Sequence, residues 1–455
     1  MGLAIRAICT PRNCVYGLGQ REWVMSRILM LFVAAMLVAG LPVESGFAQS
    51  GAPAFDVEQA SRAYIDTLQG AELEKSNNYF EGGYWLILWG AIVGILVDFL
   101  ILQSRLSARF RDWAERVTSR KWLQPALYAL PYVIAGFLIT LPWTIYTDFF
   151  REQQYDLMSQ AFGGWFGEQM IGLVISLIMF SLLIMAIFAV IRRAPKTWWL
   201  WGTGVISIFL FIGMMLGPVF ISPLFNDYQE MAEGPMRDRI VAMAAEYDIP
   251  ADNIYVFDQS KQHKRISANV SGIGPTIRIS LNDNLLERTD PEEVAAVMGH
   301  ELGHYVLGHT WRTIFILALI IGFGLFVIAR LAPRLIERHG ARWGIRNMSD
   351  PAAIPLLSLI LTAYFFAATP ALNSLVRITE SDADQFGLDS AREPDGFAEV
   401  SMRLSEYRKI EPGPIEEMLF FDHPSGATRV RMAMQWKADN VENPVIQNPG
   451  KLEQE

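Results

Sequence analysis

The chain has 455 residues, of which 52% are hydrophobic and 19% are charged, and its formal net charge at pH 7 is −9. Soluble globular proteins average about 25% charged residues, and the apolar excess here lies in runs long enough to cross a bilayer, which excludes a purely soluble protein. The negative charge argues against nucleic acid as a partner. Two cysteines are too few for a disulfide scaffold or a cysteine-rich metal site.

The first apolar run lies near the N-terminus, at Ile28–Pro42. It follows the positive segment Met25–Arg27 and precedes small residues up to Ala48, which is the order of a signal peptide. A retained first transmembrane helix is the alternative, although the run is short because spanning takes about 20 residues. We therefore predict an N-terminal extension with a signal peptide over residues 1–48, followed by an extramembrane segment over residues 49–83.

Six longer apolar segments have the length and composition of membrane helices. They are Tyr84–Leu102, Ala126–Ile145, Met170–Ile191, Trp198–Ile221, Thr313–Ala329 and Ala352–Leu372. Four of them lie within residues 84–221 and two within residues 313–372, so two membrane units flank a different kind of sequence. Asp98 is the clear charge inside a span, and it is either an end-of-helix residue near the interface or a buried functional acid.

Arginine and lysine residues gather in alternate loops of the membrane units. The loops after the first, third and fifth segments are rich in them, whereas the other short connections hold few. By the positive-inside rule, the Arg-rich loops are cytoplasmic. Residues 222–312 and the chain after Leu372 then face outward, which together with a signal peptide predicts a bacterial inner-membrane protein whose outer domain lies in the periplasm.

Residues 222–312 are charged and mixed in composition, which predicts a folded domain outside the membrane. The spacing of apolar residues predicts a helix over Gly234–Tyr247, and alternation predicts three strands. These strands are Asn253–Asp258, Arg265–Gly272 and Thr276–Leu281. A further helix is expected to begin at Asp290, a capping residue followed by proline and two acids.

The C-terminal part also reads as helix. Residues 373–437 have helical character with an interruption at Glu411–Pro414, and residues 438–455 are polar and are predicted to form a flexible tail.

The helix that begins after Asp290 contains the motif His300-Glu301-Leu302-Gly303-His304. Four residues advance a helix by about 400°, so the two imidazoles lie about 40° apart and one turn above each other, and both can bind one tetrahedral Zn²⁺. Glu301 is angled toward a water beside the metal rather than toward the metal. The motif predicts one zinc ion per chain, and two incidental histidines are the alternative.

A hydrolytic zinc site needs a third protein ligand and an open fourth position. His309 follows His300 by nine residues, or about 180° around a helix, which favours a capping or interface role over a ligand role. Glu380 and Asp384 are one helical turn apart just past the last span, so Glu380 could complete the site and Asp384 could accept the second N–H of a ligating imidazole. Arg377, one turn earlier, is placed to hold a carboxylate. From the residues alone, this run could also be only an amphipathic acidic helix.

The ordered set of motifs resembles the CAAX prenyl protease type 1 family, which comprises integral-membrane zinc metallopeptidases of the gluzincin type. The resemblance spans roughly residues 55–437 and includes Leu141-Pro142-x3-Tyr146-x2-Phe149-x2-Glu152, Ile221–Asn226, His300–His304, Glu380-x3-Asp384, and His423-Pro424 followed by Arg429. It implies a mainly α fold, in which a polytopic helical membrane bundle carries a zincin-type α+β metallopeptidase domain with a short sheet and the HExxH helix.

The resemblance also assigns roles to residues outside the HExxH motif. It implies that Glu380 is the third metal ligand and that Asp384 supports a ligating imidazole. It implies further that His423 points into the site and binds the substrate carbonyl or the oxyanion, with Arg429 supporting it. The residues around His423 show by themselves only a histidine in a loop.

In this family an edge strand with an Asn-Ala-Tyr stretch pairs with the substrate backbone. The corresponding residues here are Ser267, Ala268, Asn269 and Val270. Strand addition needs only backbone groups, so the binding mode is expected to survive this difference, whereas the side-chain preference is not.

We therefore predict a membrane-embedded zinc metalloendopeptidase in which Glu301 acts as the general base. Its expected partners are a polypeptide substrate and the lipid bilayer, and its oligomeric state is left open. An outward-facing site favours processing or quality control of membrane and exported proteins. CAAX-type processing of lipidated proteins is the alternative, and a catalytically inactive scaffold or a transporter with a structural metal is an alternative of another class.

Overall fold

The computed structural model describes residues 55–447 and 449. The predicted signal peptide therefore lies outside the described residues. The longer helices in the described part are α3 (Gly70–Gln103), α5 (Gln124–Ile145), α7 (Phe162–Arg193), α8 (Trp198–Phe220), α12 (His309–Trp343) and α13 (Ile354–Ala391). The shorter helices are α2 (Val57–Ile65), α4 (Leu106–Val117), α6 (Arg151–Gln154), α9 (Pro235–Glu246), α10 (Asp283–Arg288), α11 (Pro291–Val306), α14 (Pro394–Arg403), α15 (Pro414–Phe420) and α16 (Gly426–Asn440).

Six described helices are long and apolar enough to cross a membrane, and they are the six longer helices named above, α5 continuing to Gln154. Each predicted apolar segment lies in one of them, so the prediction of six spans is confirmed. Large apolar side chains on these helices, such as Trp85, Trp201 and Phe315, are exposed, as expected where a helix faces lipid. The boundary predicted at residue 372 falls inside α13, which continues unbroken to Ala391.

Asp98 does not lie at an exposed helix end. Its side chain is buried in α3, where the hydroxyl of Tyr132 from α5 donates a hydrogen bond to its Oδ1 at 2.7 Å. A tyrosine of the next span thus covers the carboxylate, which the sequence does not indicate, and the choice between an interfacial and a functional acid stays open.

The small sheet has the strand order β1-β2-β4-β3. Its strands are β1 (Tyr228–Glu230), β2 (Ile254–Phe257), β3 (Ala268–Ser271) and β4 (Arg278–Asn282). β2 and β4 are parallel, and β1 and β3 pair antiparallel with them at the two edges. The three predicted strands are confirmed, and β1 is an additional short strand that the sequence did not indicate.

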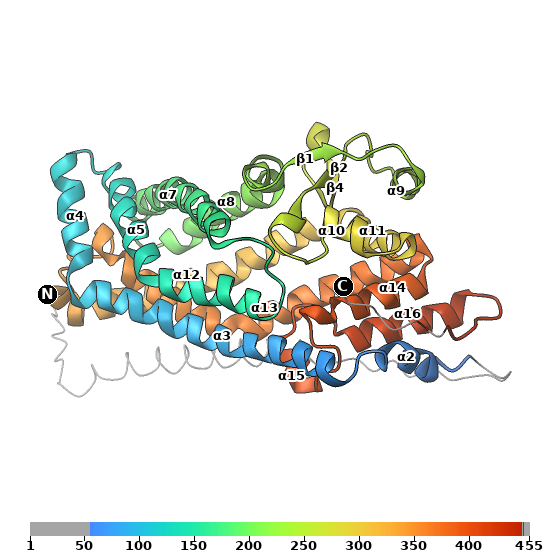
Figure 1. The fold of residues 1–455 in the computed structure, drawn as a ribbon. Helices are drawn as coiled ribbons and strands as arrows, with labels where there is room; N and C mark the ends of the chain where they lie inside the picture. Colours follow the sequence, from blue (N-terminus) through green and yellow to red (C-terminus); the bar gives the residue numbers. More distant parts are fainter. Residues whose placement is uncertain (1–54, 448, 450–455) are drawn as a thin grey trace, which may run out of the picture.

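Figure 1 shows the sheet, α9, α14 and α16 at the opposite end of the molecule from α4 and the loops that join the membrane helices there. Those loops are held together by arginines. Arg105 donates to the carbonyls of Ala341 and Arg342, and Arg111 pairs with Asp350 at 2.7 Å. The Arg-rich connections thus gather at the end of the bundle remote from the sheet.

Outside the membrane helices, two apolar cores form. One lies between the sheet, α9 and α11, and the other lies between α2, α14 and α16. The second core also fixes the chain after residue 437, because Ile446 packs against it and Gln447 donates to Asp395 at 3.2 Å. Two residues of the predicted flexible tail thus have partners that the sequence does not reveal, whereas Val441 and Val445 are exposed.

Candidate metal centre and catalytic cleft

The start of α11 is fixed by a capping box and a buried ion pair. The backbone N–H of Asp290 donates to Oε2 of Glu293 at 2.8 Å, as expected at a capped helix start. Glu293 is fully buried and accepts two hydrogen bonds of 2.9 Å from Arg403 on α14. The predicted helix start is confirmed, and the bidentate pair fixes how α11 is rotated against α14.

Two glycines let α11 and α13 approach each other closely. A Cβ atom on Gly299 would lie 2.8 Å from the carbonyl oxygen of Gly387, and a Cβ atom on Gly387 would lie 2.9 Å from the backbone nitrogen of His300. No side chain larger than hydrogen fits between the two backbones at this crossing. The close approach brings the HExxH face of α11 against the acidic face of α13.

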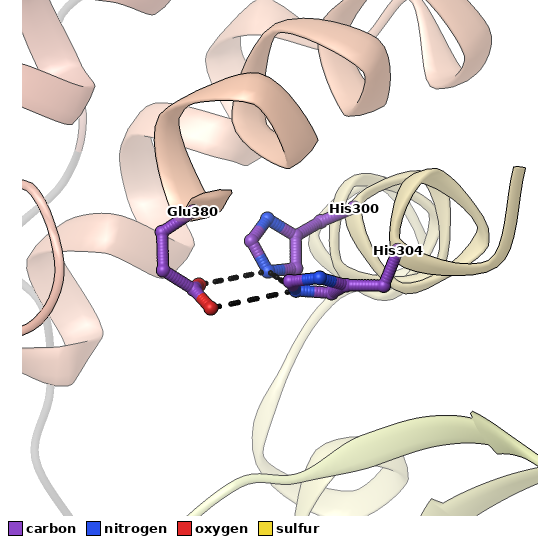
Figure 2. Close-up of side chains that lie close together, drawn as sticks. All are labelled: His300, His304 and Glu380. Atoms are coloured by element: carbon purple, nitrogen blue, oxygen red, sulfur yellow. Dashed lines mark hydrogen bonds and ion pairs between the residues drawn. The ribbon is translucent and has the colours of Figure 1, made fainter. Parts of the chain in front are cut away.

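The three predicted metal ligands meet at this crossing (Figure 2). The Nε2 atoms of His300 and His304 are 3.1 Å apart, and they lie 3.3 and 3.5 Å from the two carboxylate oxygens of Glu380. Ligand atoms at about 2.0–2.1 Å from a tetrahedral zinc ion are about 3.3 Å from one another. The donor set and its spacing therefore fit zinc, with two neutral nitrogens and one carboxylate as ligands.

Asp384 and Arg429 support His300 from behind. Asp384 Oδ1 lies 2.8 Å from Nδ1 of His300, and its Oδ2 accepts a hydrogen bond of 2.8 Å from Nε of Arg429. A carboxylate on Nδ1 fixes the tautomer that presents Nε2 to a metal. Arg429 also approaches Glu380 at 3.5 Å and forms no hydrogen bond with His423 among the described residues, so its support of His423 stays a prediction.

His304 has a supporting residue as well. Its Nδ1 lies 3.0 Å from Nδ1 of His309, which is buried at the start of α12. Gly308 has a left-handed conformation (φ +64°), which ends α11 and turns the chain so that His309 folds back toward His304. His309 therefore contacts the far side of a ligand, in agreement with the predicted interface role.

The three ionisable side chains of the HExxH motif have pKa values that are shifted in different directions. Burial lowers the pKa of His300, but hydrogen bonds to Asp384 and Glu380 outweigh it and raise the pKa to about 10 in the metal-free protein. Burial lowers the pKa of His304 to about 4 and raises the pKa of Glu301 to about 7. Glu301 is therefore poised to exchange a proton near neutral pH.

His423 points into the site, as the resemblance implies. Its Nε2 lies 3.2 Å from Glu380 Oε2, and its Nδ1 lies 2.7 Å from the carboxylate of Asp422. Burial lowers the pKa of His423, while the hydrogen bond to Asp422 opposes that shift by stabilising the charged ring. The sequence analysis did not predict the contact of Asp422 with His423, although Asp422 directly precedes the histidine in the chain.

Arg377 has a different role from the predicted one. Its Nη1 donates to the carbonyl oxygens of Glu417 and Phe421, at 2.9 and 2.6 Å, and it forms no ion pair with a carboxylate of the described residues. The residue therefore holds the segment that leads to His423 rather than an acidic ligand. The prediction failed because main-chain carbonyls of a distant segment leave no mark in the sequence around an arginine.

A cleft of about 260 Å³ opens beside these groups. Its lining includes Ser267, Ala268, His300, Glu301, Glu380, Tyr407, Arg408 and His423. Asn269 and Val270 do not line it. Tyr407 and Arg408 were not anticipated, because they lie in the loop before α15 and only the fold brings that loop to the site.

The predicted substrate strand is an edge strand, because β3 pairs only with β4. The carbonyl of Ser267 accepts from the N–H of Asn282 at 2.9 Å, so its backbone is occupied on the sheet side. Backbone groups alternate in direction along an antiparallel strand, and therefore Ala268 and Val270 present their N–H and C=O groups to the open edge.

A membrane bundle of this kind, joined to a domain with an HExxH helix and a third carboxylate, defines the class of integral-membrane metallopeptidases. Residues 231–437 match the model of peptidase family M48, and residues 57–227 match that of the CAAX prenyl protease N-terminal domain, described as having five membrane helices. Within residues 57–227, four described helices are long and apolar enough to span.

Relatives and solved structures agree with this class. The chain is 28% identical to the metalloprotease YhfN of Bacillus subtilis over 80% of this chain and 86% of that protein. It is 25% identical to the CAAX prenyl protease 1 homolog of Homo sapiens over 78% of this chain and 82% of that protein. The crystal structure of S. mikatae Ste24p superposes with a TM-score of 0.69 at 17% identity, covering 83% of this chain and 96% of that one. The chain belongs to the CAAX prenyl protease type 1 family of M48 peptidases and is a membrane metalloendopeptidase.

Proposed function

We propose that the protein binds one zinc ion through His300, His304 and Glu380 and hydrolyses peptide bonds in membrane or exported proteins. The observation that carries the proposal is the convergence of three donor atoms from α11 and α13 at mutual distances that suit one tetrahedral ion. When bound, zinc polarises the scissile carbonyl and lowers the pKa of the attacking water.

Glu301 supplies the proton transfers. It takes a proton from the attacking water and delivers it to the leaving amine, which requires a group that exchanges protons near neutral pH. Its position in the cleft beside His300, together with a pKa raised by burial to about 7, supports this role.

His423 stabilises the charge that develops on the carbonyl oxygen. The carboxylate of Asp422 opposes the lowering of the His423 pKa by burial, and when the imidazole is protonated its Nε2–H faces the metal-ligand side of the cleft. A donor held in place before the reaction stabilises an oxyanion more than a mobile one.

The substrate backbone adds to the open edge of β3. Ala268 and Val270 offer the backbone groups for this pairing, and Ala268 also lines the cleft. Ser267 contributes its side chain to the wall rather than its backbone, and Asn269 lies on the sheet side of the pairing.

Membrane or exported proteins are the proposed substrates because the site lies at the end of the bundle opposite the Arg-rich loops. In a bacterial inner membrane this arrangement places the site in the periplasm. CAAX-type processing is the second candidate, and the names of the plant and animal relatives favour it.

Replacement of Glu301 by glutamine tests the proposal. Since the three ligands are untouched, Glu301→Gln should retain about one zinc per chain, while cleavage of casein or a quenched peptide should fall by about 10²–10⁴-fold. His300→Ala should lose the metal and serves as the contrasting variant. Retained turnover in Glu301→Gln would contradict the mechanism, and proteins captured by this variant would identify the substrate class.

A further inference from the structure

Arg408 lines the catalytic cleft, and its guanidinium forms no hydrogen bond or ion pair with another described residue. Its Nη1 atom is buried without a hydrogen bond, and its side chain forms no ion pair. The residue lines the same cleft as His300, Glu301 and His423. A buried polar atom without a hydrogen bond is uncommon in proteins, so this nitrogen in a cleft needs an explanation.

The neighbouring basic residues, in contrast to Arg408, form ion pairs. Arg429, the other arginine that lines the cleft, is matched by Asp384 and Glu380. Lys409, the next residue along the chain, pairs with Glu81 and Glu416 at 2.6 and 2.8 Å. Among the described residues, both neighbours thus have ion-pair partners, whereas the carboxylates of Asp422 and Glu380 act on Arg408 only from beyond ion-pair distance.

The backbone of Arg408 is held firmly in place. Its N–H donates to the carbonyl of Leu404 at 2.9 Å, and its own carbonyl accepts from the hydroxyl of Ser76 on α3 at 3.2 Å. Ser76 is buried, so the contact joins the loop to a membrane helix. The guanidinium is therefore presented from a fixed position rather than from a mobile loop.

We propose that Arg408 binds a carboxylate of the substrate, and so selects peptides that carry a negative charge close to the scissile bond. Planar guanidinium and carboxylate groups form paired, charge-assisted hydrogen bonds that combine affinity with orientation. The carboxylate has two possible sources, the C-terminus of the substrate or an Asp or Glu side chain. The assignment rests on the proposed peptidase function of the site.

The test compares matched peptides with the full-length, zinc-loaded protein in detergent. A short peptide that the wild type cleaves is made with a free C-terminus, with an amidated C-terminus, and with its acidic side chains near the scissile bond replaced by amides. We expect the wild type to cleave one carboxylate form with a kcat/KM about tenfold or more above its amide counterpart, mostly through KM. The form that shows the preference identifies the source of the carboxylate.

In Arg408→Gln the ratio between carboxylate and amide peptides should fall to about one, and Arg408→Lys should keep part of it. Arg431→Gln is the matched control, since Arg431 is exposed and pairs with Glu58 away from the cleft; its ratio should equal that of the wild type. Equal cleavage of both forms by the wild type, or an unchanged ratio in Arg408→Gln, overturns the assignment and leaves the peptidase function standing. If the wild type cleaves no peptide at all, the proposed function fails and the assignment falls with it.

Discussion

Glu301 lies in the cleft with no hydrogen bond to another described residue. In the metal-free protein its neighbours act in opposite directions, because the protonated His300 lowers its pKa and the negative Glu380 raises it, while burial raises the pKa most. A bound divalent cation lowers the pKa of Glu301 further. The ionisation of this carboxylate is therefore set by groups that meet only in the folded protein.

We expect kcat/KM to fall as the pH is lowered through the range between about 7 and the ordinary carboxylate value of 4.5. A carboxylic acid is protonated below its pKa and then cannot accept a proton from water, so a raised pKa moves the loss of activity toward neutral pH. The measurement is the pH profile of peptide cleavage with the zinc content determined at each pH. Full activity at pH 5 with zinc retained would contradict the expectation.

At the scale of elements, the crossing of α11 and α13 builds the metal site. His300 and His304 come from one helix and Glu380 from the other, so the distance between the helix axes decides whether three ligands reach one ion. Gly299 and Gly387 set that distance, because each occupies a place where a Cβ atom would collide with the opposite backbone.

Gly299→Ala should therefore destabilise the protein by about 1–3 kcal/mol and weaken zinc binding, since the added methyl group forces the two helices apart. Gly163→Ala is the control, because a Cβ atom at this helical glycine of α7 meets nothing within 4 Å. Thermal unfolding in detergent, with and without zinc, measures both effects. Equal behaviour of the two variants would show that the crossing has room to relax.

Arg377 acts on the element that carries His423. Its two hydrogen bonds to carbonyl oxygens, and a third from Asn373 to the carbonyl of Leu419 at 2.9 Å, tie α15 and the following turn to α13. Both anchors lie on α13, the helix that supplies Glu380, so one helix positions both the third ligand and the proposed oxyanion donor.

We expect Arg377→Gln to lower kcat by about tenfold with little change in KM or zinc content, because a misplaced donor loses transition-state stabilisation while the ligands stay in place. Steady-state kinetics and metal analysis separate these quantities. Loss of zinc in Arg377→Gln would show instead that the arginine stabilises the metal site as a whole.

At the scale of the whole molecule, the six membrane helices separate two ends that carry different kinds of side chains. One end holds the Arg-rich loops, joined by contacts such as Arg111 with Asp350, and the other end holds the sheet, the metal ligands and the cleft. The orientation of the bundle therefore decides which compartment supplies the substrates.

A reporter fused to the C-terminus tests this orientation in cells. The C-terminus follows α16, which lies on the side of the metal site. We therefore expect an alkaline phosphatase fused there to be active. A fluorescent protein that is exported unfolded should give no fluorescence. The reverse pattern would place the site in the cytoplasm and favour CAAX-type processing.

The sequence by itself predicted the spans, the capped HExxH helix and the two histidines of the proposed metal site. These features depend on local patterns: apolar runs of bilayer length, a capping residue before Pro291, and ligands at one-turn spacing. The HExxH pattern indicates His300 and His304 directly, whereas Glu380 and His423 followed from resemblance to a family.

Only the tertiary structure decided which distant groups support the site. The contacts of Arg429 with Asp384 and of Arg377 with main-chain carbonyls, and the position of Arg408 in the cleft, all depend on where the loop around α15 packs. An arginine's partner is set by three-dimensional proximity, and side chains with the same local sequence signal can face a carboxylate, a carbonyl or an open cleft. For this reason the catalytic motif could be predicted from the sequence, whereas the contacts that support it and the proposed selectivity could not.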